Sequence, residues 1–79
     1  MKIFDQITVI LSQLCGATEI TAEHRLQQDL GLDSLQLVTL LLMIEEGFQI
    51  VLKEADMNPF DLTTVAQAVE LVEKYRKEK

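Results

Sequence analysis

The chain has 79 residues, of which 48% are hydrophobic and 5% aromatic, so we expect a single domain over residues 1–79 with an aliphatic core. Thirteen acidic against seven basic residues give a net charge of −6, which argues against nucleic acid as a partner and indicates either a protein partner with a basic surface or merely solubility. The single cysteine excludes an internal disulfide framework, and the longest apolar run, Leu40–Ile44, is far shorter than the roughly 20 residues that span a membrane. With no signal-peptide pattern at the N-terminus, we expect a cytoplasmic monomer.

The first predicted element is a helix over residues 2–14. Its apolar residues Ile3, Ile7, Ile10 and Leu14 recur at spacings of four, three and four, which is one stripe of an α-helix. Gly16 follows this stripe and is a suitable residue to end the helix.

A long connection without a sustained period follows, over residues 16–33. Connections of this length are uncommon in compact domains and are often functional. Four apolar side chains along it are expected to pin it against the core: Ile20, Leu26, Leu30 and Leu32.

The second predicted helix begins near Ser34 and runs to about Glu46, with Gly47 as its terminator. Asp33 and Ser34 suit a helix start because their side-chain oxygens accept the unpaired backbone N–H groups. The helix has two apolar stripes about 120° apart, of which one suffices for a core. The second, which Glu45 continues, is either extra core or an exposed binding strip. The first stripe comprises Leu37, Leu40, Leu41, Ile44 and Phe48, and the second Leu35, Val38 and Leu42.

The rest of the chain predicts a short helical turn near Lys53–Met57 and a last helix from Thr63 or Thr64. Asn58-Pro59 separates them, because proline disfavours helical geometry in the residue before it. The last helix ends in a basic tail, residues 74–79, which suits the negative end of a helix dipole. No segment alternates convincingly, so we predict an all-α domain of three main helices and one short helix. The inward face of the last helix is formed by Leu62, Val65, Val69 and Val72.

Catalytic and metal-binding arrangements are missing from the sequence. The single histidine, His24, has no cysteine or carboxylate pair at metal-ligand spacing, so we interpret it as a solvated loop residue and Cys15 as packed and inert. Asp29, Gly31 and Asp33 suggest a calcium loop, but its last ligand position would fall on Leu40, where glutamate is needed. We therefore predict no catalytic residue and no metal site.

One motif remains, the run Asp29-Leu30-Gly31-Leu32-Asp33-Ser34-Leu35 that opens the second helix. Taken alone, Asp33 and Ser34 are ordinary capping residues. The free N–H groups and positive dipole end of a helix start also favour a phosphate, so Ser34 is well placed to carry a phosphodiester. The residues by themselves leave both interpretations open.

This run, with Glu45-Glu46, Phe48 and Thr63-Thr64-Val65, resembles the acyl carrier proteins of the phosphopantetheine-binding superfamily from Ile3 to Tyr75. The resemblance implies a right-handed four-helix bundle of the acyl-carrier type, with a long loop between helices I and II and a short helix III. It also implies that a phosphopantetheinyl transferase attaches 4′-phosphopantetheine from coenzyme A to Ser34. Acyl cargo would then be held on this arm as a thioester, and the carrier itself would catalyse nothing.

In such carriers the helix after the modified serine is the main docking surface for acyl-loading and acyl-processing enzymes with basic patches. The residues that match this surface are Asp33, Leu35, Val38, Leu42, Glu45 and Glu46. The alternative hypothesis is a non-covalent helical adaptor that binds a protein partner through the same helix, with Ser34 acting only as a cap.

The chain departs from bacterial fatty-acid carriers at several positions. Gln36 replaces a usual aspartate, Thr39 a usual glutamate and Gly47 another common glutamate, and residues 50–52 are apolar where acids and a proline are frequent. The docking face is therefore less acidic. We hypothesise a carrier in a specialised polyketide or aminoacyl-type pathway, with fatty acid biosynthesis as the other possibility.

Overall fold

The computed structural model describes residues 2–77, which form three α-helices and two single-turn 3₁₀ helices. The α-helices are α1 (Ile3–Cys15), α2 (Ser34–Phe48) and α3 (Val65–Lys77), and the 3₁₀ helices are η1 (Glu54–Asp56) and η2 (Pro59–Asp61). Within residues 2–77 there is no strand, although Arg25 and Thr64 form an isolated antiparallel bridge. The all-α prediction is confirmed, whereas a fourth α-helix is not.

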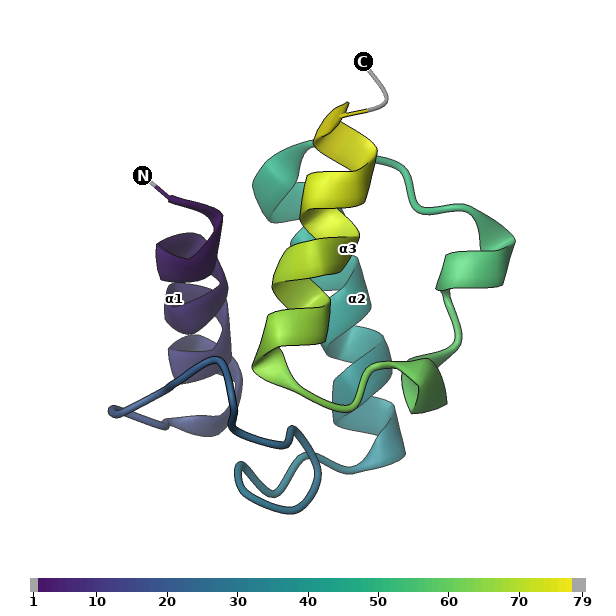
Figure 1. Cartoon of the computed structure of the whole chain (residues 1–79). Coiled ribbons are helices and arrows are strands. Elements are labelled where there is room, and N and C mark those ends of the chain that lie inside the picture. Colours follow the sequence, from purple (N-terminus) through teal and green to yellow (C-terminus); the bar gives the residue numbers. More distant parts are fainter. Residues whose placement is uncertain (1, 78–79) are drawn as a thin grey trace.

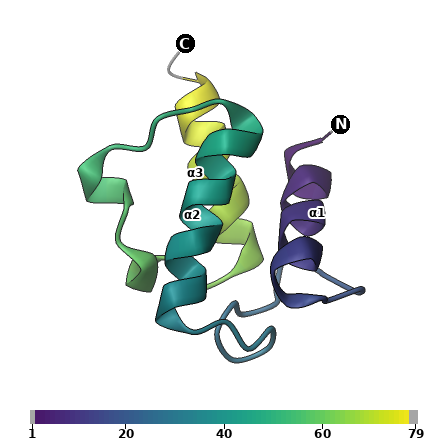
Figure 2. The same cartoon turned by 180° about the vertical axis from the view of Figure 1, so that it is seen from behind.

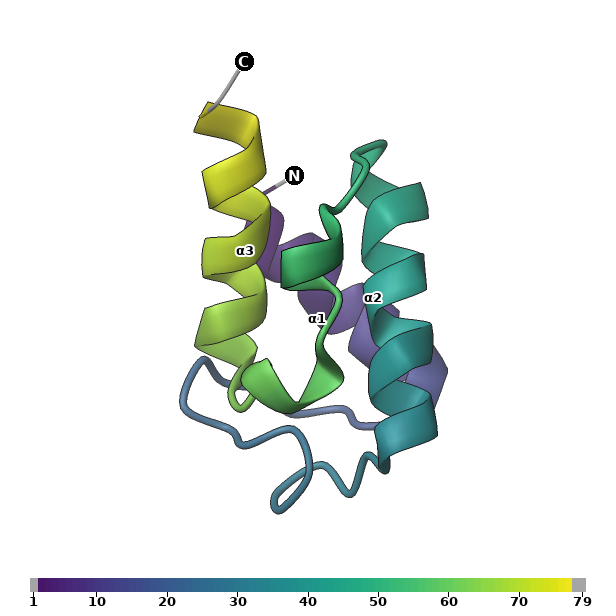
Figure 3. The same ribbon diagram turned by 90° about the vertical axis from the view of Figure 1, so that its right-hand side faces the viewer.

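The three α-helices pack around one apolar core (Figure 1). Helix α1 runs opposite to α2 and α3 and packs against both of them. The long first loop crosses the end of the molecule where α1 ends and where α2 and α3 begin (Figure 2). The segment with η1 and η2 lies between α2 and α3, on the side away from α1 (Figure 3). No helix within the described residues is long and apolar enough to cross a membrane.

Helix α1 follows its predicted stripe, shifted by one residue from the expected 2–14. Ile7 and Leu11 are completely buried and Ile10 nearly so. Gly16 ends the helix with a left-handed φ of 75°, and its N–H donates to the carbonyl of Ser12, as expected for a glycine stop.

The connection over residues 16–33 is pinned to the core and to α3. Leu26 and Leu32 are buried, as predicted, and Ile20 and Leu30 are half-buried. The backbone of the loop also caps α3, because the carbonyls of Ala22 and His24 accept the N–H groups of Ala66 and Val65 at 3.0 Å. The first turn of a helix leaves such N–H groups without helical partners, so the loop holds the start of α3 in place.

Helix α2 buries the stripe assigned to the core, comprising Leu37, Leu40, Leu41, Ile44 and Phe48. The prediction that Gly47 ends the helix is wrong. Gly47 and Phe48 remain helical, and the left-handed residue is Gln49, with a φ of 55°. The carbonyl of Glu45 accepts the N–H groups of both Gln49 and Ile50, and burial of Phe48 carries the helix beyond the glycine.

The segment between α2 and α3 contains the predicted turn near Lys53–Met57 as η1, then breaks at Asn58-Pro59. Proline opens η2, and the side chain of Asn58 caps it by accepting the N–H of Phe60 at 3.0 Å. Proline restricts the residue before it to extended geometry, so the chain is extended at Asn58, and η2 is a second turn that the sequence analysis did not predict.

Helix α3 begins one residue after the predicted start and turns Val65, Ala68, Val72 and Tyr75 inward. Leu62, just before it, is also buried, and Val69 is half-buried rather than fully inward. Residues 78 and 79 of the basic tail lie outside the described part of the chain. Within that part, Arg76 lies over the ring of Phe48 at 5.7 Å, so this basic residue contacts the core in addition to suiting the helix dipole.

Candidate functional site

Ser34 is the first residue of α2, and its side chain is exposed. The backbone reaches this position through Gly31, whose φ of 74° is left-handed, and through Asp33, which is extended. No hydrogen bond to the Ser34 hydroxyl is found within residues 2–77. Because the first turn of a helix presents N–H groups and a partial positive charge, a phosphate esterified to this oxygen would lie in a favourable field.

A reciprocal pair of hydrogen bonds holds the start of α2. The Asp33 carboxylate accepts the N–H of Gln36 at 2.8 Å, and the Gln36 side-chain oxygen accepts the N–H of Asp33 at 3.2 Å. This is a capping box that satisfies two backbone donors at the helix start. Gln36, which we expected only as a lost acid on the docking face, therefore contributes to the helix start that presents Ser34.

Asp29, the first residue of the motif, closes a turn in the loop before the helix. Its carboxylate accepts the N–H of Arg25 at 2.7 Å, and the Arg25 guanidinium lies 3.5 Å from the same oxygen. The backbone hydrogen bond from Arg25, reinforced by the guanidinium, holds the pKa of Asp29 below its ordinary value. Asp29 thus stabilises the conformation of the loop before the helix.

The second apolar stripe of α2 is at the surface. Leu35 is 74% exposed, Val38 38% and Leu42 49%. Isolated apolar side chains are common on protein surfaces, but three on one helix face beside Ser34 form a continuous strip. We call Leu35, Val38 and Leu42 the apolar strip. This exposure excludes the interpretation of the second stripe as extra core, and its role as a binding strip stays a prediction.

The three acids that we assigned to the docking surface differ in their surroundings. Asp33 and Glu46 are exposed, whereas Glu45 is half-buried. The Glu45 carboxylate accepts the N–H of Leu52 at 2.9 Å, so it supports the segment that follows α2. The structure therefore brings Asp33 to the Ser34 end of the strip and Glu46 to its far end, with uncharged Gln36 and Thr39 in α2 between them.

The other departures from fatty-acid carriers also have structural partners. Thr39 donates its hydroxyl hydrogen bond to the carbonyl of Leu35 at 3.1 Å. A Cβ atom on Gly47 would lie 3.3 Å from Cδ1 of Ile10, so the glycine permits the close approach of α1 and α2.

The sequence analysis did not predict that Phe60 lies at the surface. It is 65% exposed in η2, which packs against α2. An aromatic residue next to proline in a short connecting turn gives no periodic signal, so the sequence did not distinguish it from a core residue.

The remaining candidate residues show no binding chemistry. No group of three or more His, Cys, Asp or Glu side chains in the described residues is placed to hold a metal ion. His24 is half-buried rather than solvated, and its Nδ1 accepts the N–H of Thr21 at 3.1 Å. The Cys15 thiol is half-buried and donates to the carbonyl of Leu11.

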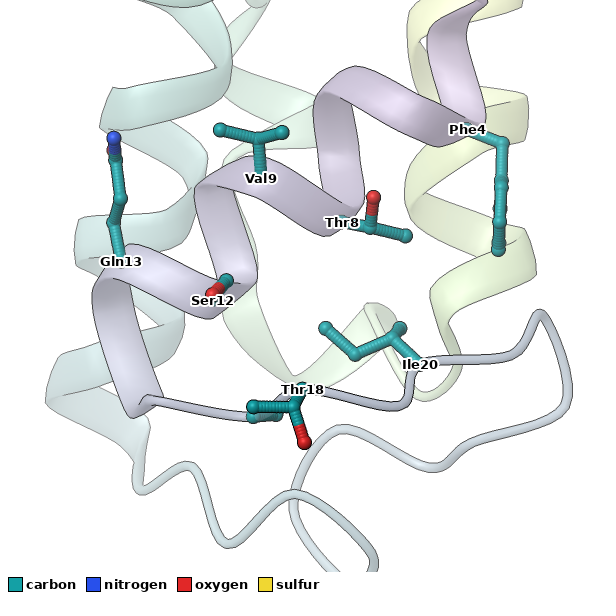
Figure 4. Close-up of a pocket in the computed structure, with 8 residues that line it drawn as sticks. Phe4, Thr8, Val9, Ser12, Gln13, Thr18 and Ile20 are labelled. Carbon is teal, nitrogen blue, oxygen red and sulfur yellow. The ribbon is translucent and has the colours of Figure 1, made fainter.

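An open pocket of about 410 Å³ lies between α1 and the first loop (Figure 4). Phe4, Thr8 and Val9 of α1 line one side of it, and Thr18 and Ile20 of the loop line the other. Neither Ser34 nor the apolar strip contributes to its wall. The pocket therefore lies apart from the residues of the motif.

Comparison with known proteins identifies relatives over almost the whole chain. The family model described as the phosphopantetheine attachment site matches residues 5–72. The acyl carrier protein of Thermotoga maritima is 36% identical over 75 residues, which is 92% of this chain and 90% of that protein. The acyl carrier protein of Amoebophilus asiaticus is 39% identical over 74 residues, which cover 92% of this chain and 90% of that protein. The acyl carrier protein of Borreliella burgdorferi is 33% identical over 75 residues, which cover 92% of this chain and 91% of that protein.

Proposed function

Because this chain belongs to the acyl carrier proteins of the phosphopantetheine attachment family, we propose that Ser34 is its attachment residue. Proteins of this family are carriers rather than catalysts and bear a covalent 4′-phosphopantetheine. The observation that carries the proposal is the exposed Ser34 side chain at the positive end of α2, preceded by the motif that holds this helix start. When attached, the arm supplies a terminal thiol that holds acyl cargo as a thioester.

The attachment reaction uses the Ser34 oxygen as a nucleophile on coenzyme A. A bond forms between this oxygen and the phosphorus next to the pantetheine, and the pyrophosphate P–O bond breaks. The adenosine bisphosphate half leaves, and the hydroxyl proton passes to a base of the transferase. The carrier contributes an accessible hydroxyl and a helix start whose N–H groups favour the new phosphodiester anion.

The partners in this proposal are a phosphopantetheinyl transferase and the enzymes that load and process the cargo. They would contact Asp33, the apolar strip (Leu35, Val38, Leu42) and Glu46, with Glu45 contributing charge from a half-buried position. Basic side chains on the partners would be steered by these acids, and salt would weaken the encounter. We place the protein in the cytoplasm, where its lone cysteine would remain reduced.

The attachment is tested by intact mass after incubation with coenzyme A and a phosphopantetheinyl transferase. The wild-type chain should gain one arm, and Ser34→Ala should gain none while keeping its helical circular dichroism. Ser12→Ala is the matched control, because Ser12 is also exposed on a helix and should not affect modification. An unmodified wild-type chain, together with partner binding that survives Ser34→Ala, would instead support the adaptor hypothesis.

For the pathway, we propose a specialised polyketide or aminoacyl-type route ahead of fatty acid biosynthesis. The supporting observation is the neutral centre of the docking face, where the side chain of Gln36 bonds to the backbone of Asp33 and that of Thr39 to the backbone of Leu35, and acids lie only toward the ends. The test is to offer the modified chain to the enzymes of a fatty acid synthase. Slow malonylation and poor chain extension are expected, and rates equal to those of a fatty-acid carrier would contradict this assignment.

A further inference from the structure

The first loop is bonded to the start of α3 through its own backbone. The N–H of Leu26 donates to the carbonyl of Thr63 at 2.9 Å, and Arg25 faces Thr64 in the isolated antiparallel bridge. The side chain of Leu26 is completely buried, so apolar packing reinforces this contact. The loop crosses the end of the molecule from which α2 and α3 begin, and this point of it is fixed to α3 (Figure 2).

From this anchored point the chain folds into a closed turn over residues 25–32, which we call the 25–32 turn. The carbonyl of Arg25 accepts the N–H of Asp29 at 2.9 Å, and the carbonyl of Leu26 accepts the N–H of Leu32 at 3.0 Å. Leu32 is buried at the end of the turn, as Leu26 is near its start. Both ends of the turn are therefore held by the core, and α2 begins two residues later.

The Asp29 side chain adds a second bond across the 25–32 turn. Its carboxylate accepts the N–H of Arg25 at 2.7 Å, so the two residues bond each other in both directions. Only Asp33 separates the turn from Ser34. Because peptide bonds are planar and this stretch is short, the conformation of the turn sets the direction from which the chain enters α2. Asp29 therefore acts on Ser34 through the backbone, although its own side chain lies in the loop.

We propose that Asp29 is a positioning residue for the attachment reaction: by closing the 25–32 turn at the start of α3, it holds the Ser34 hydroxyl in the orientation that the transferase uses. This inference rests on the proposed function of Ser34. Because the attacking oxygen must be aligned with the bond that breaks, a loss of orientation lowers the rate of the chemical step. The apolar strip lies outside the turn, so binding of the transferase should change little.

The test is the steady-state kinetics of arm attachment to the full chain, with coenzyme A and a phosphopantetheinyl transferase. Asp29→Ala should lower kcat at least about tenfold and leave KM within about twofold of wild type. Asp29→Asn keeps a side-chain oxygen that accepts the N–H of Arg25 and should recover most of kcat. Arg25→Ala keeps that backbone N–H and should lose less than Asp29→Ala. Glu19→Ala is the matched control, because it removes an exposed acid from the same loop.

Amide hydrogen exchange by NMR gives a measurement that does not depend on the transferase. The amides of Leu30 and Leu32 donate hydrogen bonds within the 25–32 turn, so both should exchange faster in Asp29→Ala than in wild type or Glu19→Ala. The amide of Leu41, in the buried stripe of α2, reports on opening of the whole domain and should accelerate far less.

The outcomes separate this inference from the proposed function. A wild-type chain that gains no arm would overturn both. Normal attachment to wild type, together with an unchanged kcat in Asp29→Ala, would overturn the positioning role alone. An equal loss of kcat in Asp29→Asn and Asp29→Ala would also overturn it, because the hydrogen bond would not be the cause. Acceleration of exchange at Leu41 by the same factor as in the turn would show a general loss of stability and overturn it as well.

Discussion

Asp33 and Gln36 bond to each other's backbone amides at the start of α2, at 2.8 and 3.2 Å. Ser34 lies between these two residues, so their reciprocal bonds define the helix turn from which its hydroxyl projects. An acid three residues after the cap would carry charge toward a partner, whereas glutamine at this position completes the box without adding charge.

Replacing the cap should destabilise the domain measurably. Asp33→Ala removes the acceptor for the N–H of Gln36 and should lower the free energy of unfolding by about 0.5–2 kcal/mol. Gln36→Ala should cost less, and Gln36→Glu should keep the box. Urea denaturation of the three variants checks the order, and a Gln36→Glu variant less stable than Gln36→Ala would contradict it.

Gly31 should resist substitution for a conformational reason. Its φ of 74° lies in the left-handed region, and no atom lies within 4 Å of an added Cβ, so strain in the backbone is the cost. Gly31→Ala should lower the free energy of unfolding by about 1–2 kcal/mol, and Gly31→Asn by less, because asparagine tolerates this region. Thermal melts check the order, and a Gly31→Asn variant less stable than Gly31→Ala would contradict it.

The two stripes of α2 should respond differently to truncation. Leu37→Ala creates a cavity in the core and should cost about 2–5 kcal/mol of stability. Leu35→Ala, at a side chain that is 74% exposed, should change stability by less than about 0.5 kcal/mol. Leu35→Ala should instead raise the KM of the transferase for this carrier. An unchanged KM in the Leu35→Ala variant would remove this residue from the docking surface.

The adjacent acids Glu45 and Glu46 provide a matched pair. Glu45→Ala leaves the N–H of Leu52 without its carboxylate acceptor and should cost about 1–2 kcal/mol in urea denaturation. Glu46→Ala should leave stability within about 0.5 kcal/mol but weaken association with a partner at low salt. An equal loss of stability in the two variants would contradict the assignment of Glu45 to a structural contact and of Glu46 to partner association.

Acid should weaken the native state through Asp29 and Asp56. Hydrogen bonds in the folded chain lower the pKa of both groups from an ordinary 3.8. The two carboxylates therefore stabilise the folded chain when the pH is above their ordinary pKa. This stabilisation is lost as the pH falls through the lower pKa values that they have in the folded chain. Asp56→Asn should be less stable than wild type at neutral pH, and the difference should shrink below pH 3.8. Urea midpoints across this range test it, and a constant difference would contradict it.

Base should act on the same contact through Tyr75. Burial, together with the Asp56 carboxylate, raises the pKa of Tyr75 above 10.0. The stabilisation from its hydroxyl is therefore complete below pH 10.0 and is lost as the pH rises through the higher folded value. The hydrogen bond between Tyr75 and Asp56 should thus persist across the neutral range.

Much of this protein follows from local patterns in the chain. Periodicity placed the core stripe of α2, and capping chemistry placed its first residue at Ser34, because neighbours along a helix determine both. Gly16 ends α1 for an equally local reason, its left-handed φ. The prediction that α2 ends at Gly47 was wrong, because glycine permits a helix end without requiring one. Burial of Phe48 extends the helix beyond the glycine.

Contacts between distant residues were decided by the tertiary structure alone. The Gln6 side chain meets the carbonyl of Gly47 across 41 positions, and Tyr75 meets Asp56 across 19. No regular spacing in the sequence predicts such pairs, because their proximity arises from the packing of separate parts of the chain. The amino-acid sequence therefore determined which residues start α2, fill the core and carry the motif. Only the packed helices determined that Glu45 and Tyr75 hold the segment between α2 and α3, since both roles need partners that the fold brings within hydrogen-bonding distance.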